Sequence, residues 1–471
     1  LRCDPEHPDG LHLLGLAKHR MGKHVEGIEI IQAAIDVNPT NPDNHNNIAL
    51  CYACIENFDR AIYHLKKAIE MKPENFLYYN NLALQYRNIG NHAEAIATLE
   101  KALQIEETTE MWTNLGGVYG ELKDMTKALE CFDKALAMNP DCAAAHVDKA
   151  FAYHLSGEWE KGFEEYEWRF AYFEQLQYYK QEYDQTKKWD GKASLEGKTI
   201  IVYSEQGMGD CIQNYRYLPL LKERGARVVL HCPESLKPIM VRLPAVDQVV
   251  VRDIVTKSGE EFPEYDYQVS SFSLPHLLKQ YAVSGKPYIA PVTRKFINII
   301  NQEYADKLKV GVVWAGSAAH PKDRTRSIPL RHFGKIKDME GVQLLNMQLD
   351  LRLRVHQNEQ QTINFAEGCQ DWDFVSLTHM IQSWEDTCTL LVGLDLVICC
   401  DTAIAHLAGA MGIPCWILLE YNNDWRWKAD GNRTEWYDSV RLFRQKERGK
   451  WEPVLDEVKE ALHEHLLSHQ R

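Results

Sequence analysis

An aspartate and a histidine lie five residues apart where an apolar run changes into a run of small residues. Residues 394–398 have the apolar pattern of a strand buried on both faces, and from Thr402 onward the spacing is that of a helix. Asp401 lies at this corner, where a carboxylate can cap the helix and free N–H groups can hold a phosphate. His406, about one helical turn later, is placed to donate to the same anion. The pattern also fits a simple helix cap and a polar surface residue.

A second corner of the same kind comes nearly two hundred residues earlier in the chain. Residues 200–203 are typical of a short buried strand, and residues 211–221 of a helix. Between them, Gly207 and Gly209 permit a tight turn against a ligand. Asp210 is then expected in the first turn of the helix, in the crevice where open α/β sheets bind ligands. Two such corners are what a two-domain nucleotide-sugar enzyme requires.

Two α/β regions must position these corners. In the first region, strands are predicted at 200–203, 228–232, 248–251 and 267–269, separated by segments of βα length. In the second, 310–314 is predicted as the first strand and 344–348 as a later one. Gly316 and Ser317 turn the chain beside the basic residues Lys322, Arg324 and Arg326. Guanidinium groups and helix N-termini can replace a metal ion in stabilising a departing diphosphate. A basic loop that is only exposed to solvent would have the same composition.

These residues belong to segments that carry a family resemblance. From about residue 189 to residue 451 the chain resembles the heptosyltransferase-like glycosyltransferases of the two-Rossmann (GT-B) class, in the bacterial-type version preceded by tetratricopeptide repeats. The matching segments are E-Q-G-M-G-D (205–210) with R-Y-L-P-L-L (216–221), V-G-V-V-W-A-G-S (310–317), D-R-T-R-S-I-P-L (323–330), L-D-L-V-I-C-C-D-T-A-I-A-H-L-A-G (394–409), D-W-R-W (424–427) and W-Y-D-S-V-R-L-F-R-Q (436–445). The order and spacing of these segments agree with those of the family over more than half of the chain.

The resemblance implies a fold and a set of site residues. The fold is a tetratricopeptide α-solenoid followed by two Rossmann-like domains, and the activity is transfer of a sugar from a nucleotide sugar to an acceptor hydroxyl. Asp210 would be the general base. The residues implied on the donor side are Gly209, Ser317, Arg324, Arg326, Gln348, Asp401, Thr402, His406 and Arg426. Gln206 and Ser273 would face the acceptor, although a serine before a proline-bounded helix is commonly only a cap.

The expected chemistry is a single displacement with inversion at the sugar C1. A base deprotonates the acceptor hydroxyl while the protein stabilises the departing diphosphate. Burial can raise the pKa of Asp210 toward a useful value, although a helix N-terminus opposes that shift. In the alternative, Asp210 positions a sugar hydroxyl and His406 or a substrate group moves the proton. No metal is expected, because the D-x-D sequence at 371–373 belongs to a different architecture and precedes a predicted helix.

The chain departs from its relatives in two places. The helix after Asp401 begins with Thr-Ala where many heptosyltransferases have Thr-Gly, and D-W-R-W is followed by the polar run K-A-D-G-N-R-T-E. The donor sugar and the acceptor are therefore not carried over from the family.

The first third of the chain is a repeat array. Small residues recur every 33 or 34 residues, at Gly27, Ala61, Ala95, Ala128 and Gly162. This period predicts five tetratricopeptide helix pairs over residues 8–174, and residues 1–5 resemble the last turn of an earlier repeat. Such a solenoid has a concave face that binds an extended peptide or a neighbouring protomer. The asparagines at 46, 47, 80, 81 and 114 either hold a peptide backbone there or are simply solvated.

Composition limits the remaining possibilities. With 471 residues and 45% hydrophobic residues, the chain is expected to form two or three domains. A net charge of −14 argues against a nucleic-acid surface. No segment has the length and hydropathy of a membrane span or a signal peptide, which predicts a cytoplasmic protein. The twelve cysteines are scattered and are expected as free thiols without a metal or other cofactor.

The predicted organisation is as follows. Residues 1–175 form the repeats, 176–197 a connector, 198–300 the acceptor-side domain, 305–446 the donor-binding domain and 450–471 a terminal helix. The expected partners are a nucleotide sugar, a protein or glycan acceptor, and a protein partner or second copy bound through the repeats. Two alternatives remain open: an enzyme acting on a surface polysaccharide or lipid-linked glycan, and a non-catalytic scaffold that binds a sugar nucleotide.

Overall fold

The computed structural model describes residues 7–173, 176, 183–252, 263–281, 284–290, 300, 302–317, 320, 322–349, 354–355, 362–363, 372 and 375–469. The D-x-D aspartates at 371 and 373 lie outside these residues. The chain divides into two compact units, one ending at Ser156 and the other beginning at Gly157. No helix within the described ranges is long and apolar enough to cross a membrane.

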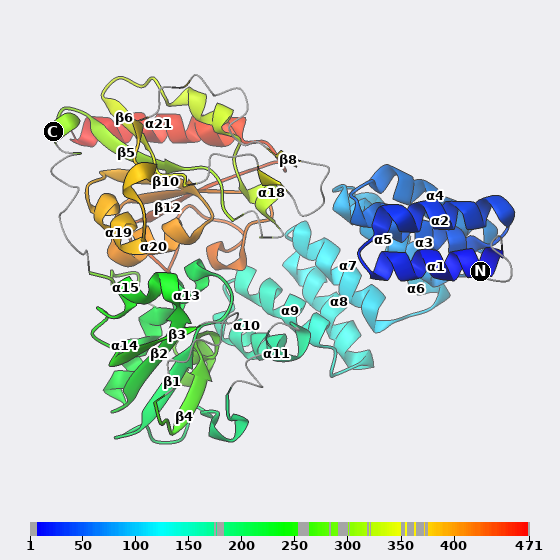
Figure 1. The fold of residues 1–471 in the computed structure, drawn as a ribbon, viewed down its shortest axis with the longest axis horizontal. Helices are drawn as coiled ribbons and strands as arrows, with labels where there is room; N and C mark the ends of the chain where they lie inside the picture. The colour runs from blue at the N-terminus through cyan, green and yellow to red at the C-terminus, as the bar shows by residue number, and fades with distance from the viewer. Residues whose placement is uncertain are drawn as a thin grey trace. The chain divides into compact units, whose positions relative to one another are not determined.

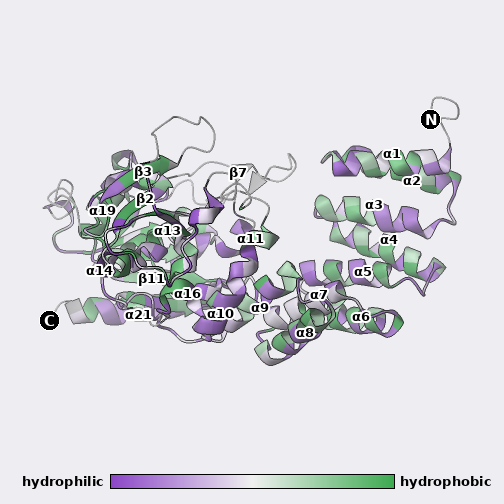
Figure 2. Ribbon diagram, turned by 90° about the horizontal axis from the view of Figure 1, so that it is seen from below, coloured by the Kyte–Doolittle hydropathy of each residue, from purple (hydrophilic) through white to green (hydrophobic). Residues whose placement is uncertain are grey.

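The first unit consists of antiparallel helix pairs (Figure 1). Its helices are α1 (Pro8–Arg20), α2 (His24–Val37), α3 (Pro42–Cys54), α4 (Phe58–Met71), α5 (Phe76–Asn88), α6 (His92–Ile105), α7 (Thr109–Glu121), α8 (Met125–Met138) and α9 (Ala143–Leu155). Their surfaces alternate between hydrophobic and hydrophilic segments, as Figure 2 shows for α1 and α2. Each helix therefore buries one face against its neighbours and leaves the other in water.

Local sequence signals set the helix ends and the spacing within each pair. Side chains of Asn41, Asn57, Asn75 and Asn91 cap the N-termini of α3, α4, α5 and α6 by accepting a backbone N–H. The small residues at the repeat positions allow paired helices to approach closely. At Gly116, for example, an added Cβ would lie 2.5 Å from the ring of Phe132 on the partner helix.

The asparagines on the first helix of each pair bond to one another. Asn81 Nδ2 donates to Asn46 Oδ1 at 2.8 Å, and Asn114 Nδ2 donates to Asn80 Oδ1 at 2.8 Å. These bonds show that the amides are not simply solvated, and binding of a peptide backbone stays a prediction. The amides cross-link successive repeats, and part of their hydrogen-bonding capacity is used within the solenoid.

The second unit begins with the helix that the sequence assigned to the fifth repeat. It contains α10 (Trp159–Glu165), η1 (Tyr166–Trp168), α11 (Arg169–Tyr172) and η3 (Gln185–Lys187). Trp159 is buried, and its indole N–H donates to Glu435 at 2.7 Å while its ring lies 5.2 Å from that of Trp436. The contacts of α10 thus tie it to the α/β region, to which the division of the chain also assigns it.

The first sheet of this unit has four parallel strands in the order β3-β2-β1-β4. They are β1 (Thr199–Tyr203), β2 (Arg227–Pro233), β3 (Gln248–Arg252) and β4 (Tyr267–Ser270). The connecting helices are α13 (Met208–Asn214), η4 (Tyr215–Tyr217), α14 (Leu218–Glu223), η5 (Glu234–Leu236), α15 (Lys237–Met240), η6 (Ser271–Ser273) and α16 (Leu274–Leu278). The strand order reverses between β1 and β4, so a ligand crevice is expected beyond the carboxyl ends of these two strands.

The second sheet has six parallel strands in the order β12-β11-β10-β5-β6-β9. They are β5 (Leu308–Val313), β6 (Val342–Asn346), β9 (Val375–Ser376), β10 (Leu396–Cys400), β11 (Cys415–Leu419) and β12 (Val440–Arg444), and a separate pair comprises β7 (Arg354–Val355) and β8 (Thr362–Ile363). The other elements are α18 (Asp323–Arg326), η7 (Leu330–Lys335), η8 (Thr378–Met380), α19 (Trp384–Val392), α20 (Ala403–Met411), η9 (Trp425–Trp427) and α21 (Glu452–His469). This is the strand order of a doubly wound sheet, with its switch point between β5 and β10.

The core of the second sheet explains why its strands are uniformly apolar. Helix α21 lies along one face of this sheet (Figure 1), where Leu455, Val458 and Leu462 are buried with residues from five of the strands. Every residue of β10 and β11 is buried. Both sheets are therefore parallel α/β structures, which is compatible with the predicted pair of Rossmann-like domains.

Candidate crevice between two strand-to-helix corners

The first corner follows β1, as the sequence predicted. Gly207 is the N-cap of α13, and its backbone N–H donates to Asp210 Oδ2 at 2.8 Å. Asp210 therefore lies in the first turn of the helix. Gln206 has a left-handed backbone with φ of 61°, and its side-chain amide donates to the hydroxyl of Tyr166 at 2.6 Å.

The second corner follows β10. Thr402, rather than Asp401, is the N-cap of α20, and no side-chain capping bond forms there. The expectation that Asp401 caps this helix is therefore wrong. Burial, together with the nearby carboxylate of Asp424, raises the pKa of Asp401 to about 7. No side chain at the N-cap competes for the N–H groups of the first turn, of which that of Ala405 donates to the carbonyl of Thr402 at 2.9 Å.

The two corners touch each other. A Cβ added to Gly209 would lie 2.7 Å from Cδ2 of His406 and 3.3 Å from Cα of Ala403. His406 is buried, its Nδ1 lies 3.0 Å from the hydroxyl of Tyr437, and its ring stacks on Trp427 with the centroids 5.3 Å apart. Burial lowers the pKa of His406 to about 3, so the imidazole is neutral and offers at most one N–H to a ligand.

Arg426 links the first corner to the loop after β11 through its hydrogen bonds. Its guanidinium donates to Asp210, to Asp424 at 2.8 Å and to Gln213 at 2.5 Å. Asp210 and Gln213 belong to the first corner, and Asp424 to the loop after β11. The side chain of Arg426 is 5% exposed. Arg426, which was expected to bind the donor, is thus bonded to protein carboxylates in this structure.

Opposing effects act on the carboxyl group of Asp210. Burial raises its pKa, the guanidinium of Arg426 lowers it, and the charge of Asp424 raises it again; the net change is upward. A change in the contact with Arg426 would therefore change the basicity of Asp210 directly.

In the basic loop after β5, the guanidinium of Arg326 can still donate a hydrogen bond. Arg326 lies against Gly316, where an added Cβ would be 2.4 Å from Nη2. Its Nε is buried and lacks a hydrogen-bond partner among the residues that the structure describes, although Asp323 Oδ1 lies 3.7 Å away. Ser317 and Arg324 are exposed. Gln348 is buried, and its Oε1 accepts the backbone N–H of Ala315 at 2.9 Å, which fixes this loop at the end of β5.

Ser273 is not available to an acceptor, which corrects the sequence-based assignment. It is fully buried, accepts from Arg169 at 2.9 Å and donates to Glu167 at 2.7 Å. The same guanidinium forms two bonds to Glu205, at 2.9 and 3.0 Å. Ser273, after β4, therefore contacts the buried ion pair between Arg169 of α11 and Glu205 after β1.

Sequence reasoning missed several residues that shape the crevice. Asp424 and Tyr437 lie inside quoted motifs but were given no role, and Gln213 lies just past the first motif. Arg169 lies outside the quoted motifs, in the segment E-W-R-F. For Asp424 and Arg169 a signal was present, because a carboxylate or guanidinium that is buried requires a partner. Gln213 and Tyr437 carried no such charge signal.

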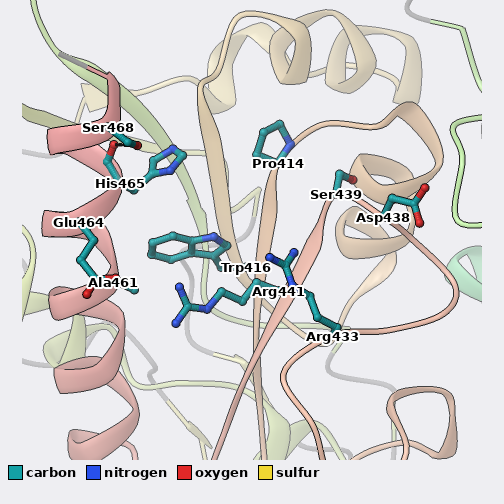
Figure 3. Close-up of a pocket in the computed structure, with 10 residues that line it drawn as sticks. All are labelled: Pro414, Trp416, Arg433, Asp438, Ser439, Arg441, Ala461, Glu464, His465 and Ser468. Atoms are coloured by element: carbon teal, nitrogen blue, oxygen red, sulfur yellow. Dashed lines mark hydrogen bonds between the residues drawn. The ribbon is translucent and has the colours of Figure 1, made fainter. Parts of the chain in front are cut away.

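A separate pocket lies at the opposite, amino-terminal end of the second sheet (Figure 3). It has a volume of about 370 Å³ and includes Pro414, just before β11, and Ser439, just before β12. Arg433 and Arg441 line it beside Trp416. None of the predicted site residues lies there.

Comparisons with known proteins confirm the repeats. Residues 64–97 and 109–142 match models of the tetratricopeptide repeat. Protein FlbA of Caulobacter vibrioides is 24% identical over 423 residues, which cover 77% of this chain and 68% of that protein.

Three similar solved structures each cover about a third of this chain. Pseudomonas aeruginosa PilF is 21% identical, with 34% of this chain and 74% of that chain covered and a TM-score of 0.32. MamA is 20% identical, with 36% and 97% covered and a TM-score of 0.31. A thermophilic tetratricopeptide-repeat protein of Thermus thermophilus is 19% identical, with 35% and 90% covered and a TM-score of 0.32. At these scores the likeness carries no argument about function.

Proposed function

We propose that this chain is an inverting, metal-independent glycosyltransferase that uses a nucleotide-sugar donor. One observation carries the proposal: the corners after β1 and β10 are in contact through Gly209 and His406, beside the carboxyl groups of Asp210 and Asp401. Acidic and basic groups from both parallel sheets thus converge where such sheets bind ligands.

The donor diphosphate would lie at the N-terminus of α20. The first-turn N–H groups of this helix favour an anion, and the unpartnered Nε of Arg326 supplies a charged donor for it. Asp401 in its protonated form adds no negative charge there, and its pKa of about 7 makes that form common near neutral pH. These groups could take the place of a metal ion as the leaving diphosphate gains charge.

Asp210 is the proposed general base. The acceptor O–H proton would move to Asp210 as the acceptor oxygen bonds to C1 and the bond from C1 to the diphosphate oxygen breaks. We propose that Arg426 exchanges its contact with Asp210 for one with the donor diphosphate. Because the guanidinium lowers the pKa of Asp210, that exchange would make the carboxylate more basic when donor is bound.

The repeats would recruit the acceptor or a partner protein. Tetratricopeptide solenoids bind extended peptides on their concave face, so a protein hydroxyl is the proposed acceptor, and a surface polysaccharide or lipid-linked glycan is the alternative. One observation favours a non-catalytic, nucleotide-binding scaffold as a second candidate. Arg426 already neutralises Asp210 in this structure.

Calorimetry with UDP, GDP, ADP, CMP and the matching nucleotide sugars provides the first test, on the wild type and on Arg326→Ala, which removes the charged donor proposed for the diphosphate. Micromolar binding of one nucleotide that weakens in the variant would support the donor site. Failure of every nucleotide to bind would contradict it.

Asp210→Asn then separates the two candidate functions. An enzyme should lose transfer in this variant and retain donor binding, because the amide keeps the shape but accepts no proton. Transfer that persists in Asp210→Asn would remove this residue from the role of base. Wild-type protein that binds donor but transfers sugar neither to water nor to any acceptor tested would favour the scaffold.

A further inference from the structure

Two histidines and a cysteine converge at one end of the first two repeats. His19 lies in the last turn of α1, His24 begins α2, and Cys54 is the last residue of α3. One ligand atom from each side chain lies within 4.8 Å of the other two. Three helices therefore bring three metal-ligand side chains to one point, although Cys54 lies 30 residues beyond His24 in the sequence.

The geometry of the three atoms matches a small tetrahedral ion. In such a site, Zn–N bonds of about 2.0–2.1 Å and Zn–S bonds of about 2.3 Å place neighbouring ligand atoms about 3.3–3.8 Å apart. His19 Nδ1 and His24 Nδ1 are 3.1 Å apart, with the ring planes at 61°. A small side-chain adjustment would place both nitrogens and the sulfur at bonding distance from one ion.

The pairing of the histidines brings two ring nitrogens, both possible metal ligands, to one place. The two Nδ1 atoms face each other, so they repel if both rings are protonated and share a single hydrogen if both are neutral. A metal ion between them would accept both lone pairs. Two nearby lysines share the single negative charge of Glu26, which accepts from Lys18 at 2.6 Å and from Lys23 at 3.0 Å.

We propose that His19, His24 and Cys54 form a Zn²⁺ site that joins α1, α2 and α3. Two imidazole nitrogens and one thiolate are the ligand types that Zn²⁺ prefers, and a water molecule would complete the tetrahedron. On binding, the S–H bond of Cys54 breaks, its proton passes to solvent and the thiolate sulfur bonds to the metal. The ion would fasten the helix pair of α1 and α2 to α3 of the next pair, at a contact between neighbouring repeats.

The neighbouring cysteine is excluded as a ligand. Cys51 is buried one helical turn earlier on α3, and its sulfur lies 3.4 Å from the position of a Cβ on Gly27. It therefore packs into the contact between repeats. The C-x-x-C spacing that the sequence displays is not the metal-binding pattern.

Cobalt and zinc titrations of the full chain, reduced and free of metal, test the site. One equivalent of Co²⁺ is expected to produce tetrahedral visible absorption with a sulfur-to-cobalt charge-transfer band, and Zn²⁺ is expected to displace it. Cys54→Ser should lose the charge-transfer band, and His24→Ala should lower Co²⁺ affinity by at least about tenfold, as loss of a ligand predicts. Circular dichroism of each variant shows that the helices remain folded.

Matched controls come from the same unit. Cys142→Ser removes a partly exposed thiol at the start of α9, and His146→Ala removes a partly exposed histidine on that helix; neither belongs to the cluster. Both should bind Co²⁺ as the wild type does. The proposal is overturned if the wild type shows no charge-transfer band, if folded Cys54→Ser keeps it, or if folded Cys142→Ser loses it.

Discussion

Gly209 lies so close to the imidazole of His406 that a methyl group at this position would be 2.7 Å from the ring carbon Cδ2. The contact joins two helices that follow strands of different sheets, α13 and α20. The absence of a side chain at Gly209 thus sets how closely the two corners approach.

Gly209→Ala is expected to separate the corners. The new methyl group would clash with His406 and with the backbone of Ala403, which cannot move as a flexible side chain can. Overpacking of this kind typically costs about 1–3 kcal/mol of unfolding free energy. Affinity for the nucleotide sugar should fall about tenfold or more if the corners form its site. Denaturant unfolding and calorimetry measure the two effects.

Gly120→Ala is the matched control. It lies in helix α7, and an added Cβ meets no atom within 4 Å. Because alanine is the better helix former, this change should leave stability unchanged or raise it by about 0.5–1 kcal/mol. Equal losses of affinity in both variants would show that the crevice does not depend on the contact between Gly209 and His406.

Binding of a nucleotide sugar should weaken as pH rises. The pKa of Asp401 is about 7 in this structure, so the carboxyl group is neutral at lower pH and adds a negative charge to the diphosphate seat at higher pH. Between about pH 6 and pH 8, affinity should fall by up to about tenfold per pH unit above the pKa. A nucleotide sugar is the proper probe, because its diphosphate does not titrate in this range.

Asp401→Asn should abolish this pH dependence, since an amide resembles the protonated acid. The stability of the unliganded protein gives an independent check. A carboxyl group whose pKa is higher in the folded than in the unfolded chain stabilises the fold at low pH, and this contribution is lost as pH rises through the folded pKa. The wild type should therefore lose stability relative to Asp401→Asn from about pH 4 to pH 7. If the stabilities of the wild type and Asp401→Asn change with pH in the same way, the raised pKa of Asp401 is contradicted.

Arg326→Ala should reduce nucleotide affinity. Its buried Nε lacks a hydrogen-bond partner among the described residues, and a hydrogen bond to a charged group contributes about 1.5–3 kcal/mol, or roughly ten- to a hundredfold in affinity. Arg433→Ala removes an arginine from the pocket at the other end of the sheet and should bind as the wild type does (Figure 3). If Arg433→Ala weakens nucleotide binding and Arg326→Ala does not, the nucleotide binds in that pocket instead.

The features that follow from local sequence could be predicted. The repeat period, the small residues at the helix contacts and both strand-to-helix corners depend on short segments with strong patterns. Asp210 and Asp401 accordingly lie beside those corners at the carboxyl ends of β1 and β10.

The pairing of side chains could not be predicted in the same way. The contact of Arg426 with Asp210 joins residues more than two hundred positions apart, and the burial of Ser273 depends on a guanidinium from α11. The cluster of His19, His24 and Cys54 could not be predicted, because its three side chains come from three helices. Such contacts depend on tertiary packing, which local sequence patterns do not encode.

The buried pair of Arg169 and Glu205 should be a main determinant of stability in the second unit. Both side chains are fully buried and joined by two hydrogen bonds. Arg169→Met would leave the Glu205 carboxyl group buried without its cation, which costs about 3–5 kcal/mol of unfolding free energy. Because the pair anchors the loop after β1 that leads to Asp210, nucleotide affinity should fall as well.

Arg87→Met is the control, because its pairing with Glu121 is partly exposed, at 30% and 25%, and such pairs contribute about 0–1 kcal/mol. The double variant Arg169→Met with Glu205→Leu tests the cause of the loss. If the penalty arises from an unpaired buried charge, removing that charge should restore part of the stability that the single variant loses. If the double variant is less stable than Arg169→Met alone, the remaining bonds of Glu205 to Ser270 and its neighbours carry the structure, and the ion pair is secondary.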